Sequence, residues 1–105
     1  MHGNMHEMKP DINRVLKVYL GADENGGYEP LYRDERMRQA FPDSYPQMME
    51  VIAPYLEEDQ EPDRTKSDLI QQAEHFAVTL RQKFPELDAT VVRALANHWH
   101  FGWSR

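Results

Sequence analysis

The amino-acid sequence predicts an all-α fold, a small bundle of four to five helices with an antiparallel C-terminal helix pair as its core. Three observations carry this prediction. Apolar residues recur at helical spacing in several segments, most clearly between residues 67 and 101. Turn and capping residues separate these segments. The length of 105 residues is typical of a single domain, and the absence of cysteine excludes a disulfide framework.

The predicted helix pair covers residues 67–84 and 89–101. Ser67 is expected to cap the first helix, and Pro85 ends it, because a residue before proline is pushed out of helical geometry. Asp88 then caps the second helix. One stripe of the first helix is apolar, and one face of the second is apolar too: Leu69, Ile70, Ala73, Phe76, Ala77, Leu80 and Phe84, then Val91, Val92, Leu95 and Trp99. A short connection between two such helices makes them an antiparallel or angled pair.

The N-terminal part divides into a predicted flexible tail, residues 1–10, and the start of a single helical domain over residues 11–105. The tail is polar and has no period. Asp11 and Gly21 are typical boundaries of a helix over residues 12–20. The segment Val15–Leu20 also consists of good strand formers, so a strand remains an alternative there.

Two further helices are predicted over residues 33–41 and 45–58. Pro54 interrupts the second of them, and we expect a kink or a restart near Ala53. The segment before these helices, residues 22–30, is a loop because it contains an Asn-Gly-Gly run. It matches neither the ligand spacing of a calcium loop nor the lysine pattern of a phosphate loop.

Negative charge is concentrated in the middle of the chain. The net charge is −6, and residues 43–68 alone hold eight acidic and two basic residues. Five carboxylates lie within residues 57–63, and ionised carboxylates are not buried without partners. This acidic segment is therefore either an exposed linker or a recognition surface. We predict that its carboxylates bind a partner: Glu57, Glu58, Asp59, Glu61 and Asp63.

The strongest basic cluster is the group of Arg33, Arg36 and Arg38, which Asp34 and Glu35 interrupt. Such a mixture is typical of a solvated helix surface, although an arginine face could also grip an acidic partner or a phosphate. No uninterrupted basic patch is present, so we expect no nucleic-acid binding.

Aromatic residues gather at the C-terminal end, where Trp99, Phe101 and Trp103 occur within five residues. Trp99 belongs to the predicted apolar stripe. Phe101 and Trp103 are expected to fold back after Gly102 and close the base of the domain. The alternative is that they anchor another chain, since aromatic residues dominate interface energetics. Phe101 and Trp103 are therefore the second set of predicted partner-binding residues.

No residue pattern indicates an enzyme, a cofactor or a metal centre. His98 and His100 lie on nearly opposite sides of a helix, and no His-x-x-x-His pair occurs in the domain. No serine stands in a nucleophile elbow. With no apolar leader and no membrane-spanning run, a cytoplasmic location without membrane contact is expected.

The best hypothesis is a small acidic protein-interaction module, such as a regulator, adaptor or inhibitor, whose partner is another protein with a basic surface. Its oligomeric state is not indicated. One alternative is a helix-turn-helix-like DNA binder that reads bases with Arg93, Asn97 and His100. A second alternative is a metal-binding protein that uses soft ligands of the tail: Met1, His2, Met5, His6 and Met8.

Overall fold

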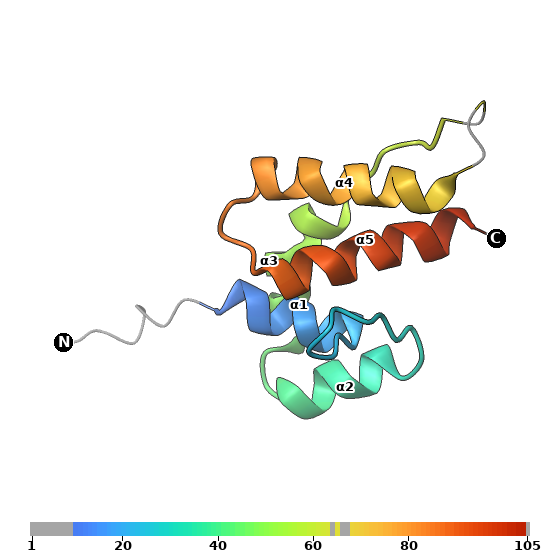
Figure 1. Cartoon of the computed structure of the whole chain (residues 1–105). Helices are drawn as coiled ribbons and strands as arrows, with labels where there is room; N and C mark the ends of the chain where they lie inside the picture. Colours follow the sequence, from blue (N-terminus) through green and yellow to red (C-terminus); the bar gives the residue numbers. More distant parts are fainter. Residues whose placement is uncertain (1–9, 64, 66–67, 105) are drawn as a thin grey trace.

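The computed structural model describes residues 10–63, 65 and 68–104, and this part of the chain is all-helical (Figure 1). It contains five helices and no strand: α1 (Ile12–Leu20), α2 (Arg33–Ala40), α3 (Tyr45–Leu56), α4 (Leu69–Lys83) and α5 (Ala89–Trp103). The predicted fold class is confirmed. The predicted tail, with its methionine and histidine residues, and Ser67 lie outside the described residues, except for Pro10. No helix in the described part is long and apolar enough to cross a membrane.

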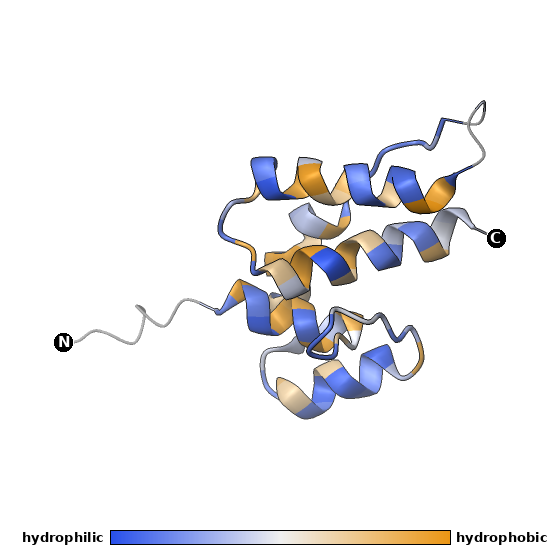
Figure 2. Cartoon of the chain, viewed as in Figure 1, coloured by the Kyte–Doolittle hydropathy of each residue, from blue (hydrophilic) through white to orange (hydrophobic). Residues whose placement is uncertain are grey.

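The C-terminal pair forms the largest helix contact of the bundle. α4 and α5 run side by side in opposite directions (Figure 1), and apolar and polar residues alternate along both helices (Figure 2). The cap of α4 is Asp68, whose side chain accepts the Gln71 backbone N–H at 2.9 Å. One stripe residue was misplaced, because Ile70 is 66% exposed. The buried side chains of the pair are Ala73, Phe76, Ala77, Leu80, Val91, Val92, Ala94, Leu95, Ala96 and Trp99.

α1 is the second organising element, since it contacts α2, α3 and α5. Val15, Leu16 and Leu20 are completely or almost completely buried. The Asp11 side chain caps the first turn, and Gly21 ends the helix in the left-handed conformation with a φ of 62°. Because glycine has no Cβ, it adopts this φ without the steric cost that other residues incur. The strand alternative for Val15–Leu20 is wrong.

Arg36 of α2 fastens the end of α1 to the following loop. Its guanidinium donates to the carbonyl oxygens of Val18 at 2.9 Å, Tyr19 at 3.0 Å and Glu29 at 2.7 Å, and also to that of Leu31. The last carbonyls of a helix have no partner inside the helix, so an arginine that binds them acts as a side-chain cap. The guanidinium lies so close to Gly21 that an added Cβ would be 2.8 Å from it. This contact orders the loop that leads to Tyr28 and Arg33.

Two helices continue past positions where the sequence predicted a restart or a fold-back. α3 continues through Ala53 and Pro54 to Leu56, so the expected restart does not occur. Pro54 lies near the C-terminal end of α3 and is exposed, so its ring is accommodated at the surface. α5 continues through Gly102 to Trp103, so Phe101 and Trp103 do not fold back. The Trp103 indole is instead held by Asp59, which keeps the last turn helical.

Candidate functional site

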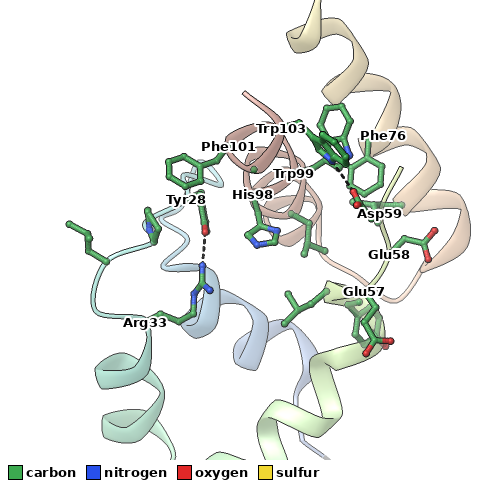
Figure 3. Close-up of a pocket in the computed structure, with 17 residues that line it drawn as sticks. Tyr28, Arg33, Glu57, Glu58, Asp59, Phe76, His98, Trp99, Phe101 and Trp103 are labelled. Carbon is green, nitrogen blue, oxygen red and sulfur yellow. Dashed lines mark hydrogen bonds between the residues drawn. The ribbon is translucent and has the colours of Figure 1, made fainter. Parts of the chain in front are cut away.

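A groove of about 860 Å³ lies between the C-terminal half of α5, the segment after α3 and the loop before α2 (Figure 3). We call it the α5 groove. Its floor is apolar and is formed by Leu56 of α3, Phe76 and Leu80 of α4, and Leu95 and Trp99 of α5. The rings of Phe76 and Trp99 stack with their centroids 5.4 Å apart. A volume of this size is typical of sites that bury a ligand or a few side chains of a partner.

One side of the groove is acidic, with Glu57, Glu58 and Asp59 following the end of α3 (Figure 3). Asp59 accepts the indole N–H of Trp103 at 3.1 Å, and Glu58 pairs with Lys83 at 2.7 Å. Glu57 and Asp59 are exposed, whereas the Glu58 side chain is only 23% exposed. The acidic side therefore carries exposed carboxylates while being fixed to both helices of the C-terminal pair.

The rest of the acidic segment also packs against the bundle. The Trp99 indole donates to the Gln60 carbonyl at 2.8 Å, and Pro62 is buried. The backbone N–H of Asp63 donates to the Gln72 side chain at 2.7 Å. Residues 57–63 are therefore mostly exposed, as expected of a linker, but they are held against α4 and α5 at these points. Glu61 and Asp63 lie outside the α5 groove, beside the N-terminal turns of α4.

The other side of the groove is cationic and aromatic. Arg33 is half-buried, and its guanidinium donates to the hydroxyl of Tyr19 at 2.9 Å and to that of Tyr28 at 2.5 Å. It also stacks over the Tyr19 ring at 4.3 Å. Tyr28 touches His98 and Phe101 edge-on, with centroid distances of 5.2 and 5.5 Å. Four of these groups line the groove across from Glu57–Asp59: Tyr28, Arg33, His98 and Phe101 (Figure 3).

Apolar side chains extend this cationic side outwards. Leu31 lines the groove and is 61% exposed, and the adjacent Tyr32 is 69% exposed. Tyr32 adopts a φ of 62°, a left-handed conformation that costs a non-glycine residue roughly 1 kcal/mol or more. Phe101 is 38% exposed at the same rim. The groove opening is therefore bordered by exposed large apolar side chains, a feature that protein-binding sites share.

His98 is the titratable group at the centre of the groove. Burial lowers its pKa, the positive charge of Arg33 lowers it further, and the negative charge of Asp59 partly opposes the shift. Desolvation and a nearby cation both disfavour the imidazolium. At neutral pH the groove therefore contains a neutral imidazole between a cation and a carboxylate.

The depressed pKa of His98 predicts a loss of stability on the acidic side. The unfolded chain takes up this proton near pH 6.5, an ordinary histidine value, while the folded chain resists it. Stability should therefore fall as the pH decreases below about 6.5. Denaturation midpoints at about pH 7.5 and pH 5.5 should differ more for the wild type than for His98→Gln. The control is His75→Gln on exposed α4 surface, and equal pH dependence of wild type and H98Q would contradict the assignment.

The structure brings together five of the seven residues that the sequence predicted for partner binding. Glu57, Glu58 and Asp59 face the groove from one side, and Phe101 and Trp103 border it from α5. Sequence reasoning missed Tyr28, Arg33 and His98 as members of this site. One signal was present, because His98 and Phe101 are three residues apart and share a helix face. The contacts of His98 with Tyr28, and of Tyr28 with Arg33, depend on tertiary packing and leave no pattern in the sequence.

Two of the three residues of the DNA-binding alternative, Arg93 and Asn97, have partners within the bundle. Arg93 forms a two-pronged ion pair with Glu74, with distances of 2.9 and 3.0 Å. Asn97 donates to the Gly26 carbonyl at 2.8 Å. α5 itself is enclosed by α4 and α1 over much of its length. Within the described residues, no group of three or more histidine, aspartate or glutamate side chains could hold a metal ion.

No protein-family model matches this chain, and neither a curated protein nor a solved structure does.

Proposed function

We propose that this chain is a non-enzymatic protein-interaction module that binds a segment of another protein in the α5 groove. The bound segment presents basic side chains to Glu57, Glu58 and Asp59, and apolar side chains to the groove floor and to Phe101. The observation that carries this proposal is that the carboxylates of Glu57–Asp59 and the aromatic rings of Phe101 and Trp103 line the same α5 groove. An apolar centre with a charged rim is the usual anatomy of a protein interface.

Electrostatics support the choice of a basic segment. The chain has a net charge of −6, and most of the imbalance lies in residues 43–68. Glu57 and Asp59 are exposed at the groove, so they attract a basic partner before contact is made. The DNA-binding alternative has less support, because Arg93 and Asn97 already have partners within the bundle.

Selection of short random peptides on the wild-type chain tests this proposal. The enriched peptides should combine lysine or arginine with large apolar residues. Against one such peptide, the triple variant Glu57→Gln, Glu58→Gln and Asp59→Asn should associate about tenfold more slowly at low salt. Its association should also depend less on salt, because charge attraction acts mainly on the association rate.

A second triple variant controls for the general loss of negative charge. Glu24→Gln, Glu35→Gln and Glu50→Gln remove the same charge from exposed positions that do not line the groove. This variant should associate nearly as fast as the wild type. The proposal is wrong if no peptide is enriched, or if both triple variants slow association equally.

A further inference from the structure

We propose that the Arg33 side of the α5 groove binds a carboxylate side chain of the partner segment, so that the segment must carry an acidic residue as well as basic ones. This inference rests on the proposed function and specifies the chemistry of the partner. In this inference the acidic side of the groove binds basic side chains, and the Arg33 side binds a carboxylate.

The hydrogen bonding of Arg33 leaves capacity for an anion. A guanidinium has five N–H donors, and two neutral tyrosine hydroxyls accept from Arg33. Its Nε is buried and has no hydrogen-bond partner among the described residues. Tyr19 and Tyr28 orient the guanidinium, but they do not neutralise it.

Four other cations among the described residues already have polar partners, and Arg14, Arg38 and Arg81 are exposed and do not line the groove. Arg93 pairs with Glu74, Lys83 with Glu58, and Lys17 with Asp88. The guanidinium of Arg36 donates hydrogen bonds to backbone carbonyl oxygens. Arg33, by contrast, lines the groove without a carboxylate partner in the part of the chain that the structure describes. A half-buried cation without a counter-charge is costly, and a bound carboxylate offsets that cost.

The surroundings of Arg33 strengthen such a contact. The rings of Tyr28 and Phe101 and the neutral imidazole of His98 pack together on this side of the groove. Charge-assisted hydrogen bonds are stronger where the local dielectric is low. Leu31, which is exposed beside Arg33, offers apolar contact to the residues that flank the bound carboxylate.

Two oppositely charged sides give the groove a direction. A segment that places its acidic residue at Arg33 and its basic residues at Glu57–Asp59 satisfies both sides. A reversed segment brings like charges together at both ends, and such contacts exclude wrong partners. The partner is therefore a dipolar segment with an apolar middle, rather than a uniformly basic one.

Peptide selection on three versions of the chain tests this inference. On the wild type, selected peptides should carry aspartate or glutamate at a constant spacing from lysine or arginine. On Arg33→Gln the acidic preference should disappear while the basic and apolar preferences remain. Arg38→Gln is the matched control, because Arg38 is exposed on the same helix and does not line the groove. It should select the same peptides as the wild type.

A double-mutant cycle then measures the contact. The probe is a wild-type-selected peptide and its version with the acidic residue replaced by the corresponding amide. The replacement should weaken binding to the wild type by about tenfold to a hundredfold, the usual range for a charge-assisted pair. It should have little effect on binding to Arg33→Gln. Arg33→Lys should recover only part of the loss, since lysine cannot form a two-pronged contact.

The outcomes separate this inference from the proposed function. Peptides that are enriched in basic and apolar residues without a fixed acidic position would overturn the inference alone. Equal weakening of wild type and R33Q by the amide replacement would also overturn it. Failure to enrich any peptide would remove the proposed function, and the inference with it. Matching denaturation midpoints of R33Q and wild type would show that the fold is intact.

Discussion

Replacing Leu80 by alanine should destabilise the domain by roughly 2–5 kcal/mol, the usual range for a fully buried leucine. Leu80 has no exposed surface and lies at the centre of α4. Its side chain belongs to the core and also lines the floor of the α5 groove. The substitution removes apolar contacts and leaves a cavity that the neighbouring helices can fill only in part.

Chemical denaturation compares this variant with Val78→Ala on the same helix. Val78 is 39% exposed, and alanine is the better helix former, so this control should change stability by less than about 1 kcal/mol. If Leu80→Ala unfolds at the same denaturant concentration as the wild type, the packing of α4 against α5 is not as described.

Replacing Arg36 by alanine should destabilise the domain by roughly 2–4 kcal/mol, because several carbonyl oxygens lose a charged donor together. These oxygens belong to the end of α1 and to the loop before α2. Water can reach some of them after the substitution, so the loss is smaller than the sum of separate hydrogen bonds. Arg36→Lys should recover little, since an ammonium cannot span the same oxygens.

The matched control for Arg36 is Arg38→Ala, two residues further along α2. Arg38 is exposed, and its guanidinium lies over the Tyr45 ring at 5.4 Å. Its removal should cost less than about 1 kcal/mol. Hydrogen exchange gives an independent measure, because Arg36→Ala should speed exchange in the loop over residues 21–32. Equal stability losses for the two arginine variants would contradict the capping role of Arg36.

Local chemistry made the helices predictable. Asp11 and Gly21 bracket α1 as expected, because capping and left-handed geometry depend on neighbouring backbone atoms alone. Pro85 follows the end of α4 for a similar local reason. The predicted bounds of the other helices differ from the structure by at most two residues, which is the normal extent of uncertainty at helix ends.

Tertiary contacts explain what the sequence could not predict. The helix continues through Gly102 because the Trp103 indole finds Asp59, more than forty residues away in the chain. The acidic segment is held because the Trp99 indole reaches the Gln60 carbonyl. Neither contact leaves a periodic signal in the sequence.

The candidate site was predictable only in part, because its residues come together through tertiary contacts. Composition singled out the carboxylates at Glu57–Asp59 and the aromatic residues Phe101 and Trp103, but not their proximity. Arg33 belonged to an ordinary-looking arginine cluster. Its role as the groove cation emerges only when α2 docks on α1, which places Tyr19 and Tyr28 around its guanidinium.

The most direct test of the central claim is a nuclear magnetic resonance titration of the isotopically labelled wild-type chain with a selected peptide. The chain has two tryptophans, and both indole N–H groups are bonded to the acidic segment beside the groove. We predict that the Trp103 indole signal shifts, together with backbone signals of residues 28–33 and 57–59. Shifts confined to the Arg93 surface of α5, with both indole signals unchanged, would show that the partner binds elsewhere.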